Sequence, residues 1–387
     1  MTYFLIPIII NKIDINDIEF VEGESTLFIS KTLHKYLKLI KENIDNYSVA
    51  WDIYKKYTNP YEFIHTPIPN ENTSIAIEKP LSRSYFKLIE MIKGHSLLDS
   101  MGSSINSFHL AEGPGGFIEA LVELRKNKND KYYGITLQQD SVGVPGWSKA
   151  NNFLNKHNNV YIENGIDNTG NLYHFENLNY CFEKYGNTMD FITGDGGFDF
   201  SVDFNEQEND AIRLLFSQMC FAISLQKKGG TFILKFFDIL NTATIDLVYI
   251  LNMFYDQCYI SKPCTSRSGN SERYLICKKF LYTNTSHFLT KWKTIYEFLE
   301  YKKVHRFLNI KLPYLFINKL EEINLVIGKN QIENILYTIR LIKMDESDRI
   351  QKLNIIKKKN IEKAISWCVK YNIPYYKNMG TNIFIRN

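Results

Sequence analysis

The sequence predicts an α/β protein built on an open, doubly wound, mostly parallel sheet. Three observations support this fold class. Short apolar runs alternate with helical patterns through the middle of the chain. A glycine-rich turn follows one of these runs and opens a helix, as in sheets that bind a ligand at the end of a strand. The 387 residues, 44% hydrophobic and 23% charged, suffice for one large domain or two.

Residues 1–80 are expected to form an irregular N-terminal extension. Its apolar start, Phe4 to Ile10, is too short to span a bilayer and lacks the basic front and cleavage site of a signal peptide. We interpret this run as a buried strand. Helical periodicity extends from Ser30 to Tyr57, before the breakers Asn59-Pro60 and Pro67 to Asn70.

The predicted main domain covers residues 81–280 and opens with a helix at Ser82–Lys93. Strands are expected at the apolar runs Asn106–Ala111, Lys131–Leu137, Val160–Glu163, Met189–Thr193, Thr231–Phe236 and Glu272–Lys278. Further helices are expected at Gly116–Lys126, Glu208–Gln226 and Thr244–Tyr255. Ligands of such sheets bind beyond the carboxyl ends of the strands, where the glycine turn and Asp195 fall.

Residues 281–387 are predicted to form a basic, helical region. Apolar positions recur at helical spacing over Ile332–Ile342 and Ile361–Val369, with Lys357-Lys358-Lys359 between them. This region holds 19 Lys and Arg against 9 Asp and Glu, a balance of +10, whereas the rest of the chain holds 27 against 33, or −6. The asymmetry indicates a polyanion partner, although a solvated helical surface or a clamp over the sheet would give the same pattern.

The cysteines are scattered and contain no CxxC pair, which argues against a zinc site and against a disulfide framework. A reducing intracellular compartment is therefore expected, and no metal. The six positions are Cys181, Cys220, Cys258, Cys264, Cys277 and Cys368.

The glycine turn Gly113-Pro114-Gly115-Gly116 lets the backbone approach a bound cofactor closely. By itself such a turn fits nicotinamide dinucleotides, flavins and S-adenosylmethionine alike, or a purely structural turn. The dinucleotide version requires a third glycine where this chain has Ile118, and an acidic residue after the next strand, which ends at Leu137 without one. A dehydrogenase is therefore disfavoured.

Four ionisable residues stand in separate, recognisable segments: Lys87, Asp195, Lys235 and Glu272. Lys235 ends an apolar strand, where a charged amine is costly unless it is paired. Partial desolvation balanced by carboxylates would suit an amine that guides a hydroxyl proton. Taken singly, these residues could equally be a snorkelling lysine, a turn aspartate, a strand-start glutamate and a solvent-facing helix lysine.

The motifs around these residues resemble the FtsJ-like ribose 2′-O-methyltransferases, and most closely the cap-specific mRNA enzymes of eukaryotes and large DNA viruses. The resemblance covers roughly residues 50–280. It is carried by SRSYFKL, LAEGPGGF, YGITL, GDGGF, ILKFFD and SRSGNSERYLICK. It implies a Rossmann-like methyltransferase fold with S-adenosylmethionine as the methyl donor.

The resemblance also implies roles for individual residues. Lys235 would orient or deprotonate the ribose 2′-hydroxyl, Asp195 and Glu272 would set its charge state, and Lys87 would complete the catalytic tetrad. The cofactor loop would be Gly113, Pro114, Gly115 and Gly116, joined by Asp195. Asp167, in a segment that departs from the usual family pattern, is expected to hold the adenine, although an ordinary turn is equally compatible.

The expected cap and RNA contacts are Lys55, Glu208, Arg267 and Asn270. Glu208 follows GDGGF at the place of a glutamate that faces the methylated guanine, and Asn270 precedes Glu272 as a cap-facing asparagine does. Lys55 lies four residues before an Asn-Pro-Tyr-Glu stretch that is similar to one in cap enzymes. An aromatic residue stacking on the cap is expected, but the sequence does not select it.

The sequence therefore predicts an intracellular, cytoplasmic enzyme that methylates the 5′-terminal ribose of capped mRNA. Capped RNA is the expected partner, a capping-apparatus protein a possible second one, and no membrane is expected. Two other functions stay open: a ribosomal or transfer RNA ribose methyltransferase, and an RNA-binding subunit that has the fold without the catalysis.

Overall fold

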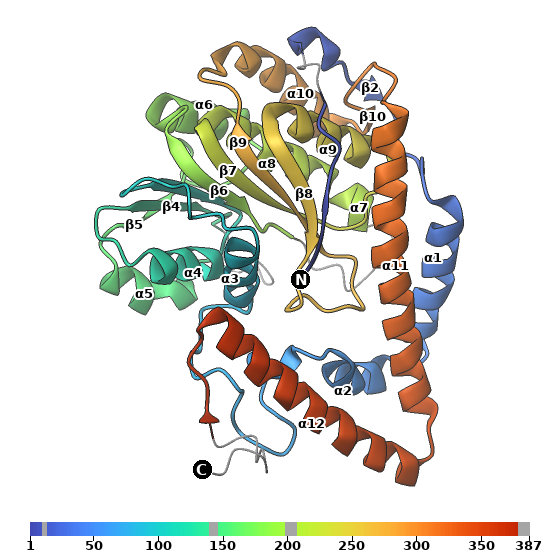
Figure 1. Cartoon of the computed structure of the whole chain (residues 1–387). Coiled ribbons are helices and arrows are strands. Elements are labelled where there is room, and N and C mark those ends of the chain that lie inside the picture. Colours follow the sequence, from blue (N-terminus) through green and yellow to red (C-terminus); the bar gives the residue numbers. More distant parts are fainter. Residues whose placement is uncertain (10–13, 139–145, 198–206, 378–387) are drawn as a thin grey trace.

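The computed structural model describes residues 1–9, 14–138, 146–197 and 207–377, and an eight-stranded sheet forms its centre (Figure 1). The strand order is β1-β8-β9-β7-β6-β3-β4-β5. The strands are β1 (Thr2–Leu5), β3 (Asn106–Leu110), β4 (Lys131–Ile135), β5 (Val160–Glu163), β6 (Met189–Gly194), β7 (Gln226–Phe236), β8 (Tyr255–Lys262) and β9 (Arg273–Phe280). The five neighbouring strands β5, β4, β3, β6 and β7 are parallel. Beyond β7, the strands β9, β8 and β1 extend the sheet through antiparallel pairs. The mostly parallel α/β fold is confirmed.

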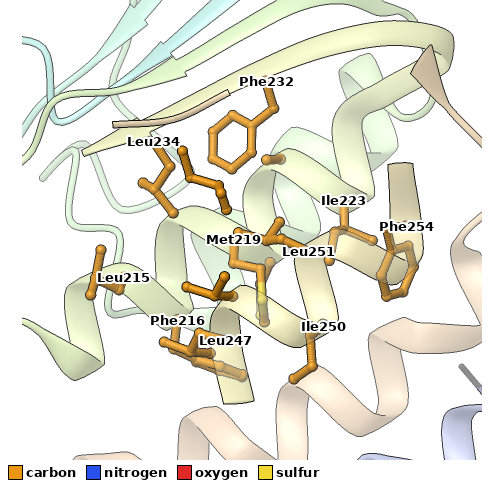
Figure 2. Close-up of a cluster of buried hydrophobic side chains, with 14 of the residues drawn as sticks. Leu215, Phe216, Met219, Ile223, Phe232, Leu234, Leu247, Ile250, Leu251 and Phe254 are labelled. Atoms are coloured by element: carbon orange, nitrogen blue, oxygen red, sulfur yellow. The ribbon is translucent and has the colours of Figure 1, made fainter. Parts of the chain in front are cut away.

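Helices cover both faces of the sheet because its central strands are apolar on both sides. In β7, Phe232 and Leu234 face one hydrophobic cluster and Ile233 faces the other. Figure 2 shows the first cluster, where β7 packs on two helices that are buried along most of their length. The helices of this face are α6 (Phe175–Tyr185), α8 (Ile212–Leu225), α9 (Thr242–Phe254) and α10 (Leu289–Tyr301). The opposite face is covered by α3 (Ser84–Gly94) and α4 (Gly116–Arg125).

The order of the parallel strands reverses between β3 and β6. The chain runs from β3 outward through β4 to β5, then returns to β6 and continues to β7 on the other side. Such a reversal opens a crevice at the carboxyl ends of the two strands. The glycine turn follows β3, and Asp195 follows β6, so both lie at this crevice as expected.

In the N-terminal extension, the stretch with predicted helical periodicity forms two helices. They are α1 (Lys31–Asp45) and α2 (Ser48–Thr58), separated at Asn46 and Tyr47. The predicted buried strand at Phe4–Ile10 is also corrected: strand β1 spans Thr2–Leu5 at the sheet edge, where most of its residues are exposed. A strand at an edge has a partner on one side only, and its apolar residues are covered less.

The C-terminal region adds two long helices, α11 (Tyr314–Lys343) and α12 (Glu346–Tyr371). Helix α11 runs beside the sheet and packs on α1 and α2, whereas α12 crosses below α3 and α2 (Figure 1). Lys357-Lys358-Lys359 therefore lies inside a helix. Asn334 Nδ2 donates to Thr58 O over 2.8 Å, and Asn360 Nδ2 donates to Tyr57 O over 2.7 Å. Helix α2 of the N-terminal extension and the two C-terminal helices thus pack together.

The remaining short elements connect these layers. They are η1 (Ile15–Asp17), β2 (Val21–Glu22), η2 (Glu62–Ile64), η3 (Ser148–Ala150), α5 (Asn151–Lys156), α7 (Gln207–Asp210), η4 (Ser286–Phe288) and β10 (Val304–Arg306). Strands β2 and β10 pair as an antiparallel ribbon. Within the described residues, every helix is too short or too polar to cross a membrane.

Candidate active site

A cavity of about 900 Å³ opens at the carboxyl ends of the parallel strands, and we name it the sheet-edge cavity. Its floor holds Asp195, Lys235 and Glu272, and Gly113 of the glycine turn lines one side. Helices α1, α2 and α11 supply the opposite wall. A cavity of this size and position is typical of a binding site for a small molecule or cofactor.

Lys87 and Glu272 form a buried ion pair beneath this cavity. The Lys87 Nζ lies 2.7 Å from Glu272 Oε1 and 2.8 Å from Oε2, and the Lys87 residue is 4% exposed. A solvent-facing role for Lys87 is therefore excluded. Burial lowers the pKa of Lys87, which the Glu272 charge opposes. Burial alone would raise the pKa of Glu272, but nearby lysines outweigh burial and lower this pKa.

Lys235 and Asp195 form a second pair at the ends of neighbouring strands. Lys235 Nζ donates to the Asp195 backbone oxygen over 2.8 Å and lies 3.5 Å from Asp195 Oδ1. A Cβ on Gly197 would lie 2.9 Å from this ammonium, so the glycine leaves the amine room. The Lys235 side chain lines the cavity, where a ligand can reach it.

Tyr274 connects the two pairs, and the sequence did not single it out. Its hydroxyl donates to Asp195 Oδ1 over 2.8 Å and accepts from Lys87 Nζ over 3.3 Å. Tyr274 lies opposite Lys235 in the β7–β9 register, and two residues after Glu272. Strand alternation from Glu272 could have found it, because residues two apart share a face. The four predicted tetrad residues thus lie in one hydrogen-bonded group.

Lys262, at the end of β8, was also missed. Its ammonium donates to Asn270 O, Asn270 Oδ1 and Glu272 O over 2.9, 2.6 and 2.5 Å. Burial lowers the pKa of Lys262 to about 7, and the Glu272 charge opposes this. All three protons of the ammonium are used, so Lys262 fixes the loop that carries the predicted cap residue Asn270.

The glycine turn is held closely against neighbouring chain segments. Gly115 has φ +105°, a conformation that favours glycine, and a Cβ on Gly116 would lie 2.3 Å from the hydroxyls of Ser82 and Ser84. Gly113 lines the cavity, whereas Pro114 follows it in the turn. Beside this turn the cavity continues to Thr136 and Leu137 after β4. The residues present fit an S-adenosylmethionine molecule because a glycine-rich turn, the Asp195 carboxylate and a cavity of about 900 Å³ meet here.

Asp167 does not line the cavity. Its carboxylate accepts hydrogen bonds from Thr169, His174 and Asn177, which is the turn arrangement that the sequence left open. The segment that it braces does reach the cavity through Gly170 and Tyr173. Burial would raise the pKa of Asp167, but the hydrogen bond from His174 and those from its other partners lower it.

The predicted cap residues divide into two groups. Lys55, Arg267 and Asn270 line the sheet-edge cavity. Glu208 does not: its Oε1 accepts from the backbone N–H groups of Leu240 and Asn241, each over 2.7 Å. Helix α7 begins at Gln207, which faces the cavity instead, and one residue along a helix turns the side chain by about 100°. Burial raises the pKa of Glu208 to about 7.

The Asn-Pro-Tyr-Glu stretch braces the loop between β8 and β9. Glu62 receives a bidentate contact from Arg267, with Nε to Oε2 at 3.0 Å, and Asn59 Oδ1 accepts from Ser268 N over 3.0 Å. The aromatic side chain on the α2 wall is Trp51, which lines the cavity near Lys55. The Glu62–Arg267 and Asn59–Ser268 contacts both depend on the fold, since the partners are more than 200 residues apart in the chain.

Comparison with known proteins finds a family match and cap-specific mRNA methyltransferases among the relatives. Residues 80–280, just over half of the chain, match the FtsJ-like methyltransferase family. The chain is 26% identical over 266 residues to cap-specific mRNA (nucleoside-2′-O-)-methyltransferase 2 of Drosophila melanogaster, covering 64% of this chain and 36% of that protein. It is 34% identical over 200 residues to the corresponding methyltransferase 1 of Mus musculus, covering 47% and 23%.

The chain thus spans about a third or less of the length of these two relatives. Among solved structures, the chain is similar to a ribosomal RNA methyltransferase from Plasmodium falciparum, with 24% identity and a TM-score of 0.37; the match covers 52% of this chain and 98% of that protein. S-adenosylmethionine is the methyl donor that the family and the cavity indicate. By the match over residues 80–280, this chain belongs to the FtsJ-like methyltransferase family.

Proposed function

We propose that this protein transfers a methyl group to the ribose 2′-hydroxyl of a 5′-terminal nucleotide of capped mRNA. The observation that carries the proposal is the convergence of Lys87, Asp195, Lys235 and Glu272 in one hydrogen-bonded group beside the glycine turn. These four residues come from four separate segments, and the family match covers all of them.

The chemistry assigns a distinct task to each group. S-adenosylmethionine, when bound, supplies a methyl group already activated on sulfur. In its neutral amine form, Lys235 Nζ at the cavity floor holds the ribose hydroxyl and accepts its proton as the oxygen–methyl bond forms and the sulfur–methyl bond breaks. Asp195 positions Lys235, and Glu272 keeps Lys87 paired in the buried layer below. Most of the rate acceleration comes from holding the hydroxyl in line with the methyl group.

The cap preference is supported by the wall opposite the glycine turn. Trp51 and Lys55 of α2 line this wall, and Asn270 lines the cavity from the loop between β8 and β9; together they offer an aromatic ring, a cation and an amide to a charged base and its phosphates. The relatives reported above are named as cap-specific mRNA enzymes, which favours a capped substrate over ribosomal or transfer RNA.

The test is methyl transfer from labelled S-adenosylmethionine to a short capped RNA and to the same RNA without a cap. We expect label on a ribose 2′-oxygen of the capped RNA, and a loss of at least about 100-fold for Lys235→Ala, since it removes a positioned proton acceptor. Lys227→Ala, on the same strand but in an exposed pair with Asp190, is the matched control and should retain activity.

The outcomes separate the competing functions. Equal transfer to capped and uncapped RNA would contradict the cap preference and support the ribosomal or transfer RNA alternative. If wild type and Lys235→Ala modified RNA indistinguishably, catalysis at this site would be excluded, and the non-catalytic RNA-binding alternative would gain support.

A further inference from the structure

A second cavity, of about 430 Å³, lies along helix α12, and we name it the lysine cavity. Its rim carries Lys359, Lys363 and Lys370 from α12, while Tyr61 and Cys264 close the far side. We propose that the lysine cavity binds the backbone phosphates of RNA that extends beyond the methylated nucleotide. This inference rests on the proposed function, because it assigns a second part of the same substrate.

The charge at this cavity is unbalanced. All three lysines are exposed, and among the described residues none of them forms a salt bridge with a carboxylate. Glu362 is the acidic residue of the described lining. Exposed lysines without carboxylate partners attract polyanions, and their counterions are released when phosphates bind.

The spacing of the lysines suits a chain of phosphates better than one small anion. Lys359 and Lys370 are eleven residues apart on one continuous helix. At about 1.5 Å per residue they stand about 16 Å apart along the axis. Several successive phosphates fit that length, since one strand of a nucleic acid carries a charge about every 3.4 Å of its axis.

The two cavities share their dividing wall. Asn59 lines the sheet-edge cavity, and Tyr61, two residues later, lines the lysine cavity. Likewise Arg267 lines the first and Cys264 the second. Two residues of chain span at most about 7 Å, so a strand leaving the active site has a short path across this wall. This continuity favours RNA over an unrelated acidic protein.

The test compares two triple variants that remove the same charge. Lys359→Gln, Lys363→Gln and Lys370→Gln together remove the three lysine charges from the lysine cavity. Lys311→Gln, Lys352→Gln and Lys358→Gln together form the matched control, because these lysines are exposed and lie outside both cavity linings. Binding of a capped RNA of about 20 nucleotides, longer than a single-strand site, is measured by fluorescence anisotropy over a range of salt concentrations.

We expect the lysine-cavity variant to bind this long RNA roughly tenfold more weakly, and its plot of log K against log salt to be shallower by about 2, since each single-strand phosphate contact contributes about 0.7. Methyl transfer to a capped dinucleotide should stay at the wild-type rate. The control should keep a slope close to that of the wild type.

A lysine-cavity variant with the same slope and affinity as the control would overturn the inference, even if it had lost binding to some acidic protein. Failure of the proposed function would look different: no capped RNA would accept a methyl group from the wild type. The salt dependence would still report on the lysine cavity in that case.

Discussion

Lys87 and Glu272 keep their charges inside the protein because each satisfies the other. The effective cost of moving one such ion out of water into a protein is several kcal/mol, and removing one partner of a buried pair typically costs about 3–5 kcal/mol. Their geometry, with two oxygens within 2.8 Å of the ammonium, repays much of that cost. The pair therefore acts as fixed support under the more accessible Lys235.

Lys262 should make stability depend on pH near neutrality. Its pKa is lowered to about 7 in the folded protein, against an ordinary value of 10.5, so the unfolded chain binds more protons between these two values. Stability should therefore rise with pH from about 7 toward 10.5, at most by about 1.4 kcal/mol per pH unit, and the cost of burying the charge is fully present below pH 7.

Urea unfolding of wild type and Lys262→Met at pH 6, 7, 8 and 9 measures this effect. We expect the wild type to gain stability relative to the variant above about pH 7. Lys262→Gln should follow Lys262→Met, because neither side chain titrates. A difference between wild type and both variants that stayed constant with pH would contradict the assignment.

The sequence singled out four residues that the structure brings into one hydrogen-bonded group, because each stands in a segment with its own pattern. Lys262 and Tyr274 escaped notice because a polar residue in a strand gains meaning only from its cross-strand neighbours. At Glu208 the sequence located the segment, whereas the structure places its neighbour Gln207 at the cavity. Side-chain direction within a short helix is set by tertiary packing, which the pattern does not contain.

Among the elements, the loop between β8 and β9 depends most on distant support. It carries Arg267 and Asn270 into the sheet-edge cavity, and Glu62 of η2 holds Arg267 by a bidentate contact. Burial would raise the pKa of Glu62, but the hydrogen bond and charge of Arg267 lower it. The charged carboxylate is thus the form that braces the loop.

Glu62→Gln should loosen this loop without removing a side chain. Hydrogen bonds to charged groups contribute about 1.5–3 kcal/mol, so we expect KM for capped RNA to rise roughly tenfold while kcat changes less. Steady-state methyl-transfer kinetics measure both. Glu71→Gln, which alters a half-exposed pair with Lys357 in the same manner, serves as control and should change KM little.

An unchanged KM in Glu62→Gln would show that the loop holds its shape without the ion pair.

Elements that depend on tertiary contacts were the hardest to predict from the sequence pattern. Strand β8, with polar residues along its length, was not predicted, and the break between α1 and α2 carries neither glycine nor proline. Strand β8 is held by its pairing with β1 and β9, and helices α1 and α2 both pack on α11.

At the scale of the whole molecule, packing crosses the predicted boundaries at residues 80 and 280. Trp292, Ile295, Phe307 and Phe316 belong to the same hydrophobic cluster as the sheet. Each buried side chain of this size contributes about 1.5–3 kcal/mol, so together they approach the 5–15 kcal/mol that stabilises a typical protein. The division into residues 1–80, 81–280 and 281–387 stays a prediction.

A chain that ends at residue 280 should therefore fail to fold cooperatively. We expect low solubility and no sharp thermal transition, as followed by circular dichroism, because the apolar side chains that Trp292 and its neighbours cover would be open to water. A chain that ends at residue 377 keeps all these residues and is the control. A soluble 280-residue chain with a cooperative transition and methyl-transfer activity would instead support separate domains.

The pairing of Thr2–Leu5 with Tyr255–Lys262 has a consequence for biosynthesis. A ribosome delivers the first strand long before its partner exists, and the wall residues Gln331 and Asn334 emerge later still. The chain must therefore emerge as far as Asn334 before the pocket has all its sides. A nascent chain shorter than this has an incomplete site.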